Sequence, residues 1–209
     1  MSPLNAEEKG FLLRLARKSL EAAVRNEKME MPAKAPPALI IPAGAFVSLY
    51  KQGHLRGCIG YVQSANPLYR TVIEAATAAA LLDTRFEPVR PEELPEIEME
   101  ISVLSPLREV LPEEVRVGTH GLMVSQGRAR GLLLPQVAVE HHWQPERFLE
   151  ETCRKAGLAS DAWRRGAKTE AFTAEVFNER FLESEQPQNS LTATPVPPHH
   201  PEKPLPEKK

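Results

Sequence analysis

The chain has little cysteine and no long apolar run. Cys58 and Cys153 are the only cysteines among its 209 residues, and they form no Cys-x-x-Cys pair, which excludes a disulfide framework and a cysteine-based zinc site. No stretch approaches the roughly 18 consecutive apolar residues that span a bilayer. The first residues mix acidic and apolar side chains, unlike a secretory signal. We therefore expect a soluble, cytoplasmic protein with no membrane association.

An excess of charge of one sign is also missing. The sequence has 26 Lys and Arg residues against 28 Asp and Glu residues, for a formal net charge of -2. This balance provides no whole-molecule attraction to nucleic acid or to an anionic membrane. Scattered basic residues are usually solvated surface, so we do not expect nucleic acid as a partner. The candidates for a local basic patch are Arg128, Arg130, Arg164, Arg165 and Lys168.

Aromatic residues are few, but 42% of the chain is hydrophobic, enough for one sizeable domain. The apolar pattern predicts an α+β fold with an antiparallel or mixed sheet and packed helices. Helices are expected after a capping box at Asn5 and Glu8, from Pro67, from Pro135 and from Pro145. Strands are expected over residues 45–51, 56–62, 97–105, 122–124, 132–134 and 171–177.

The end of the chain differs in composition from the rest. Residues 184–209 are rich in proline and have almost no aliphatic side chains, so they cannot offset the entropy of ordering. We predict a domain over residues 1–183 and a disordered tail over residues 184–209. The tail carries His199 and His200, but a flexible segment does not preorganise metal ligands. No metal site and no cofactor are expected.

The densest group of chemically active residues is the run His54–Gly60. Cys58 lies between Gly57 and Gly60, and glycine allows another backbone or a ligand to approach closely. Arg56 would favour the thiolate if its side chain lay close to the sulfur. The helix from Pro67 begins only about eight residues later, so its N-terminus could also hold a thiolate or an anion. A buried, inert cysteine at the end of a strand is the alternative.

Further polar candidates lie elsewhere in the sequence. Asp83 and Arg85 follow an alanine-rich helix that we place against the sheet carrying Cys58, and His120 precedes Gly121 and an apolar strand. The acidic side of strand 97–103 is expected to face solvent. If that side faces a cleft instead, Glu98 and Glu100 become acid or base candidates. The second cysteine, Cys153, is expected in the core.

Together, these motifs resemble a known family. The hexapeptide LRGCIG stands at Leu55–Gly60, Asp-x-Arg-Phe at residues 83–86, Gly-x-His-Gly at residues 118–121 and Leu-Pro-x-Val-Ala at residues 134–138. Over most of residues 5–180 the chain resembles the AMMECR-type domain family. The resemblance implies an α+β domain of two unequal lobes with a cleft, forming one folding unit, and it makes Gln136 a ligand-binding candidate. It also suggests a Memo-like protein and a radical S-adenosylmethionine enzyme as partners.

Two functional hypotheses use the same loop. In the first, the protein is a cysteine-dependent enzyme or modification factor, with Cys58 as the nucleophile and His120 as the general acid or base. In the second, it is a non-catalytic adaptor that binds a ligand or a protein, and Cys58 is merely small enough to fit. The groups that would contact such a ligand are Arg56, Gly57, Gly60, Asp83, Arg85 and Gln136.

Overall fold

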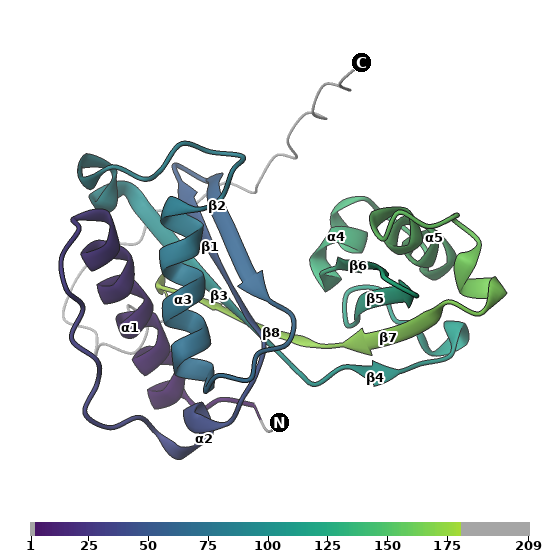
Figure 1. Cartoon of the computed structure of the whole chain (residues 1–209), viewed down its shortest axis with the longest axis horizontal. Helices are drawn as coiled ribbons and strands as arrows, with labels where there is room; N and C mark the ends of the chain where they lie inside the picture. The colour runs from purple at the N-terminus through teal and green to yellow at the C-terminus, as the bar shows by residue number, and fades with distance from the viewer. Residues whose placement is uncertain (1–2, 181–209) are drawn as a thin grey trace, which may run out of the picture.

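The computed structural model describes residues 3–180, which form two lobes of unequal size (Figure 1). Each lobe is built on its own four-stranded sheet, and all strand pairs in both sheets are antiparallel. This arrangement confirms the predicted α+β class. The proposed disordered tail, residues 184–209, lies outside the described residues.

The larger lobe combines the first half of the chain with its last described strand. Two long helices pack against the sheet and against each other, and the strand order is β2-β1-β3-β8. Its elements are α1 (Ala6–Val24), α2 (Pro37–Ile40), β1 (Ala45–Lys51), β2 (His54–Tyr61), α3 (Leu68–Leu81), the 3-10 helix η1 (Pro91–Glu96), β3 (Ile97–Leu104) and β8 (Ala174–Asn178).

The smaller lobe is contiguous in sequence. Its strand order is β4-β7-β5-β6, and α5 packs on β5 and β6, which buries Cys153 completely and confirms it as a core residue. The elements are β4 (Arg108–Glu109), η2 (Pro112–Glu114), β5 (Gly121–Gln126), β6 (Ala129–Leu133), α4 (Pro135–Glu140), α5 (Pro145–Lys155), η3 (Ala162–Arg165) and β7 (Lys168–Phe172).

Local sequence signals determine several element boundaries. Asn5 and Glu8 form the predicted capping box at the start of α1, each side chain bonding the other residue's backbone N–H at 2.9 Å. Gln52 and Gly53 both have positive φ, 52° and 79°, as a two-residue hairpin turn requires. One boundary differs from the prediction: Pro67, the expected first helical residue, is itself the N-cap of α3, and no side chain caps this helix.

The predicted strand over residues 171–177 is in fact two strands in different lobes. It divides at Thr173, so that β7 pairs with β5 in the smaller sheet and β8 pairs with β3 in the larger. At the crossing, the Ser105 N–H donates to the Thr173 carbonyl at 2.9 Å, and the Thr173 N–H donates to Ser105 Oγ at 2.9 Å. These bonds hold the two connections between the lobes side by side.

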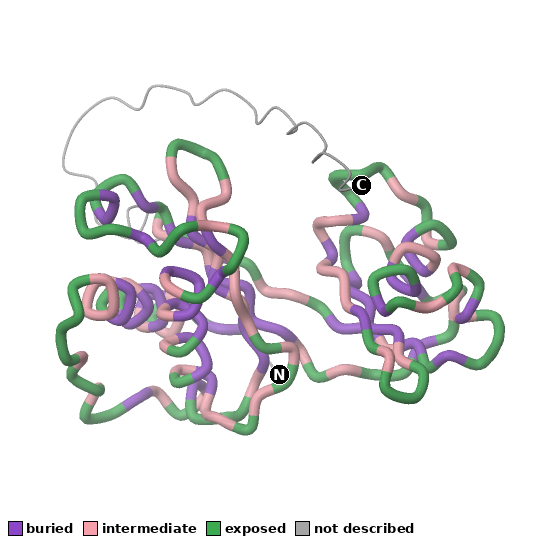
Figure 2. The backbone as a smooth tube through the Cα atoms, turned by 45° about the horizontal axis from the view of Figure 1, so that its top comes forward, coloured by how far each residue is buried: buried purple, intermediate pink, exposed green. Residues whose placement is uncertain are grey.

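Each lobe has its own buried interior (Figure 2). The larger core lies between the sheet and helices α1 and α3, while separate clusters fill the smaller lobe. Within residues 3–180, no helix combines the length and the apolar character needed to cross a membrane.

The contact between α3 and β2 is unusually close, as predicted from the alanine content of the helix. A Cβ on Gly57 would collide with the carbonyl oxygen of Ala79. Ala75, Ala76 and Ala79 on the same helix are almost entirely buried. Small side chains on both elements therefore let the backbones approach, and Gly57 is required by space rather than by backbone conformation.

Replacing Gly57 by alanine should therefore destabilise the fold. The added methyl group has no room, and we expect Gly57→Ala to lower the free energy of unfolding by about 2–3 kcal/mol. Gly53→Ala is the matched control, because a Cβ at Gly53 meets no atom and its cost is backbone strain of about 1 kcal/mol. Urea denaturation measures both; equal losses would contradict the close contact.

Candidate functional site

The face of the larger sheet that α1 and α3 leave uncovered carries a row of polar residues. Cys58 on β2 pairs with Ser48 on β1, Ser48 pairs with Glu100 on β3, and Glu100 pairs with Asn178 on β8. Their sequence neighbours Val47, Leu49, Met99 and Ile101 are fully buried in the core, so the row faces the other way. Directly opposed side chains have Cβ atoms about 5 Å apart. We call these four residues the polar row.

Cys58 is half-buried and held on three sides. The Ser48 hydroxyl donates to its sulfur at 3.2 Å. Its backbone N–H donates to Asp83 Oδ2 at 2.8 Å, and its carbonyl oxygen accepts from Arg85 Nη2 at 3.2 Å. Asp83 and Arg85 thus bond the outer side of β2, where a neighbouring strand would otherwise pair.

Asp83 and Arg85 form a two-pronged ion pair. Arg85 Nε lies 2.9 Å from Asp83 Oδ1, and Nη2 lies 2.7 Å from Oδ2. The hydrogen bond from Arg85 is the largest influence on Asp83 and, with the backbone N–H of Cys58, outweighs burial, lowering the pKa of Asp83 to about 2. Asp83 raises the pKa of Arg85 in turn, and the nearby Cys58 side chain adds to this effect. Arg85 is therefore the cation beside the cysteine.

Arg56 points away from this cluster. Leu49 pairs with Gly57 and Tyr50 with Leu55, so Arg56 is the extra residue of a β-bulge. A bulge interrupts the strand's alternation and redirects a side chain.

The guanidinium group of Arg56 anchors the segment that follows Arg85. It donates to both carboxylate oxygens of Glu93 at 3.1 and 3.0 Å. It also donates to the carbonyls of Glu87 and Pro88 at 2.8 and 3.3 Å. The charge of Arg56 is therefore paired within the protein.

The expected contribution of a helix N-terminus to Cys58 is wrong. Gly57 packs against Ala79, and Cys58 bonds Asp83, just beyond the last residue of α3. Cys58 consequently lies at the C-terminal end of this helix. The first helical residue, Leu68, is roughly 16 Å away along the axis at 1.5 Å per residue.

His120 belongs to the smaller lobe and is nearly buried. The backbone N–H of Arg116 donates to His120 Nδ1 at 3.2 Å, and Arg108 Nη2 lies 3.5 Å from Nε2. Burial, followed by the charges of Arg108 and Arg116, lowers the pKa of His120, so the ring is neutral at neutral pH. None of the described contacts joins His120 to Cys58.

The smaller lobe contributes charge to the polar row through α4. Burial, and then the charge of Glu140 on α4, raise the pKa of Glu100. Burial also raises the pKa of Tyr50, with Glu100, Cys58 and Glu140 adding to the effect and the hydrogen-bonding neighbour Ser48 opposing it. Gln136, one helical turn before Glu140, shares its side of α4. Glu140 on α4 therefore lies close enough to the polar row to affect the pKa of Glu100 and of Tyr50.

Sequence reasoning found only part of this site. It identified Cys58, Asp83 and Arg85, which hydrogen bonds join, and it raised Glu100 only for the case in which the strand faced a cleft. Gln136 stays a prediction. It missed Ser48, Tyr50 and Glu140. Alternating polarity indicated that Ser48 and Tyr50 share a face, but only the strand register brings them to Cys58.

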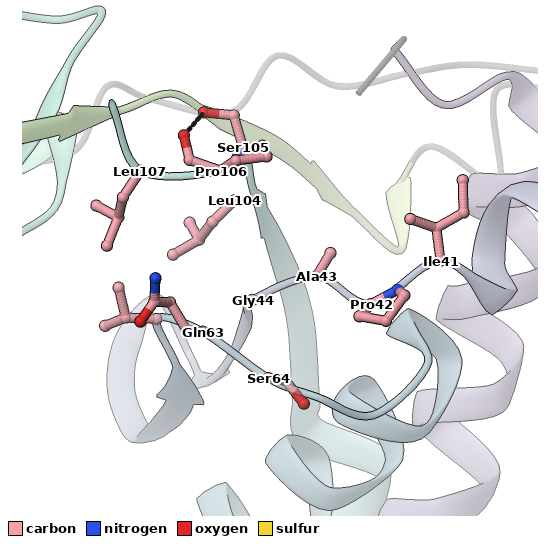
Figure 3. A pocket seen from close by; sticks show the side chains of 11 residues that line it. Ile41, Pro42, Ala43, Gly44, Gln63, Ser64, Leu104, Ser105, Pro106 and Leu107 are labelled. Atoms are coloured by element: carbon pink, nitrogen blue, oxygen red, sulfur yellow. Dashed lines mark hydrogen bonds between the residues drawn. The ribbon is translucent and has the colours of Figure 1, made fainter. Parts of the chain in front are cut away.

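Two adjoining hollows lie between and beside the lobes. One, of about 470 Å³, is lined from the larger lobe by residues 60–63 and from the smaller by Met123 and residues 130–132. The other, of about 390 Å³, includes residues 41–44, 62–64 and 104–107 (Figure 3). Both are lined by Val62 and Gln63, so the two hollows adjoin at this short segment. Within the described part of the chain, no group of three or more His, Cys, Asp or Glu residues could hold a metal ion.

The Arg56–Glu93 pair should make stability sensitive to acid. The hydrogen bond from Arg56, the largest influence, lowers the pKa of Glu93 to about 2, against an ordinary value of 4.5. The ion pair therefore stabilises the folded protein fully above pH 4.5, and this stabilisation is lost as the pH falls through about 2.

Glu93→Gln should lower the free energy of unfolding by about 2 kcal/mol at pH 7, and this difference from the wild type should shrink at pH 3. Glu98→Gln, which removes an exposed pair with Arg180, should cost under about 1 kcal/mol. Urea denaturation at both pH values tests the pair; a pH-independent loss for Glu93→Gln would contradict it.

The comparisons with known proteins agree with one another. The sequence profile of the AMMECR1 family matches residues 13–177. A protein from Thermofilum pendens is 44% identical, over 88% of this chain and 99% of the relative. A protein from Thermococcus gammatolerans is 47% identical, over 82% and 90%. The crystal structure of the uncharacterised protein PH0010 from Pyrococcus horikoshii is similar, with a TM-score of 0.79 and 41% identity over 84% of this chain and 93% of that chain. The chain belongs to the AMMECR1 family.

Proposed function

We propose that this protein is a cysteine-dependent enzyme or modification factor whose reacting group is the Cys58 thiol. The observation that carries the proposal is the polar row, in which a half-buried cysteine accepts a hydrogen bond from Ser48, itself paired with Glu100. An inert core cysteine would be surrounded by apolar side chains, as Cys153 is.

Glu100 replaces His120 as the acid or base in this proposal. Its pKa is raised by burial and by Glu140, which is the direction of shift expected of a carboxyl group that donates or accepts a proton in a reaction. Ser48 stands between Glu100 and Cys58 in the strand register. Its hydroxyl group donates to the sulfur in this structure, so to pass the proton on it turns to accept from the thiol and to donate to Glu100. In this role, Cys58 attacks an electrophilic atom of the substrate and the thiol proton leaves through Ser48 to Glu100.

The Asp83–Arg85 pair positions the nucleophile. Because Asp83 holds the Cys58 N–H and Arg85 holds the Cys58 carbonyl, the backbone on both sides of the sulfur is fixed. Arg85 remains partly exposed, and it supplies the positive charge that a developing anion at this site would meet.

The alternative is a binding module that uses the same site without chemistry. The observation that favours it is the absence of His120 from the described contacts of Cys58, which leaves the site without the commonest catalytic base. The proposed partners, a Memo-like protein and a radical S-adenosylmethionine enzyme, rest on the family resemblance and suit either role.

Thiol labelling tests the polar row directly. With iodoacetamide, the native protein should label at Cys58 alone, and Cys153 should react only after unfolding.

Ser48→Ala removes the donor to the sulfur and should slow labelling at pH 7 about threefold. Glu100→Gln removes the proton acceptor and should slow labelling about two- to fivefold, with no effect at a pH where Glu100 is protonated. Glu98→Gln, an exposed carboxylate on the same strand, is the control. Equal rates in all four proteins would contradict the coupling.

Replacing Cys58 separates chemistry from binding. In a strain lacking the gene, Cys58→Ser should fail to restore the deletion phenotype if the thiol reacts, since serine keeps the size but is far less nucleophilic. Unfolding curves of the purified variant must match the wild type. Full restoration by Cys58→Ser would overturn the enzyme proposal and favour the binding module.

A further inference from the structure

Two strand edges lie on opposite sides of the interlobe hollow. In the larger sheet β2 is an outermost strand, and in the smaller sheet β6 is one. Figure 1 shows both on the sides of their lobes that face each other. The 470 Å³ hollow is lined by Gly60 and its neighbours from one edge and by Arg130, Gly131 and Leu132 from the other.

The register identifies the backbone groups that point outward from β2. Cys58 directs both its N–H and its carbonyl away from β1, because both bond the side chains of Asp83 and Arg85. Outward-pointing residues alternate along an antiparallel strand, so the N–H and carbonyl of Gly60 point outward too. At Gly60 this edge borders the hollow.

The same reasoning applies to β6. Gln126 pairs with Ala129 across a two-residue loop, and the pair that closes such a loop is hydrogen-bonded. Arg130 and Leu132 therefore direct their N–H and carbonyl groups to the outer side of β6. Gly131, between them, packs on α5 instead.

Among residues 3–180, no described hydrogen bond occupies the outward backbone groups of Gly60, Arg130 and Leu132 at the hollow. Proteins commonly block an edge with proline, a bulge, a covering segment or a charged side chain, and of these the β6 edge has the side chain of Arg130. On β2 the bulge at Arg56 and the Asp83–Arg85 pair protect the edge as far as Cys58, and this protection ends before Gly60, about 7 Å farther along the strand. A chain added at Gly60 would therefore end beside Cys58.

We propose that the interlobe hollow binds an extended polypeptide segment, which adds as a strand to these edges and brings one of its side chains to Cys58. This inference rests on the proposed function in that it names a protein or peptide as the substrate class. Main-chain hydrogen bonds supply the affinity in this mode of recognition, so the hollow accepts many sequences. The adjoining 390 Å³ hollow, with Leu104 and Leu107 on its wall (Figure 3), receives apolar side chains of the same segment.

Disulfide tethering to Cys58 provides the test. The probes are acetylated hexapeptides of Val, Thr and Ser with one terminal cysteine, each supplied as its mixed disulfide with 2-mercaptoethanol. Exchange with the Cys58 thiolate forms the protein–peptide disulfide and releases 2-mercaptoethanol, so that no further oxidant is needed. A tether gives the peptide an effective concentration in the millimolar range, so that even weak strand pairing forms. Pairing stabilises the protein–peptide disulfide and therefore raises the reductant concentration that releases half of the peptide.

Release of half of the unmodified peptide should need a reductant concentration about tenfold higher than release of half of the 2-mercaptoethanol adduct. N-methylation of alternate residues in either register should reduce this resistance about five- to tenfold, because alternate residues of the segment face β2 and β6. Retention equal to that of 2-mercaptoethanol, or retention unchanged by methylation in both registers, would overturn the proposal.

Two variants at one position locate the pairing on β6. Arg130→Pro removes the outward N–H at an edge where proline is tolerated, and it should weaken peptide retention about fivefold. Arg130→Ala keeps the N–H and should stay within twofold of the wild type. Iodoacetamide labelling of Cys58 should be unchanged in both variants. If the wild type labels normally but does not retain the peptide, the peptide substrate is rejected while the proposal of a reactive Cys58 stands. Concentration-dependent dimerisation that Arg130→Pro abolishes would assign the edge to a second copy instead.

Discussion

The close approach of α3 to β2 is the constraint on which the site depends. Because Gly57 has no side chain, the backbone of β2 lies against the carbonyl of Ala79, and the end of the helix is carried to the outer edge of the sheet. Asp83 and Arg85 leave the helix at that point and bond both sides of Cys58. A glycine in the hexapeptide thus positions residues that lie more than twenty places later in the sequence.

The residues of the hexapeptide have different surroundings. Arg56 and Gly57 serve the fold: the bulge turns Arg56 to Glu93 and to the loop after α3, and Gly57 fits the helix. Cys58 alone reaches the polar row. The groups beside its sulfur come from β1 and from the segment after α3, and the next carboxyl group along the row comes from β3.

Sequence patterns predicted the elements and failed at long-range register. The capping box at Asn5 and Glu8, the alternating strand 97–104 and the packing of the alanine-rich helix on β2 all follow from local spacing and residue size. The bulge at Arg56 does not, because one extra residue in a strand shows only when the partner strand is placed. Ser48 and Glu100 likewise became site residues through pairing across three strands. The break at Thr173 lies inside a largely apolar run that is typical of one strand, so only the separation of the lobes reveals it.

The pairing of β3 with β8 has a consequence for the order in which the chain assembles. These two strands are neighbours in the larger sheet, yet the whole smaller lobe is inserted between them in sequence. During synthesis the ribosome therefore releases every residue of the smaller lobe before β8 exists, and the first sheet stays one strand short until then. A smaller lobe that folds early shortens the loop that must close to join β8 to β3, which lowers the entropic cost of completing the larger lobe.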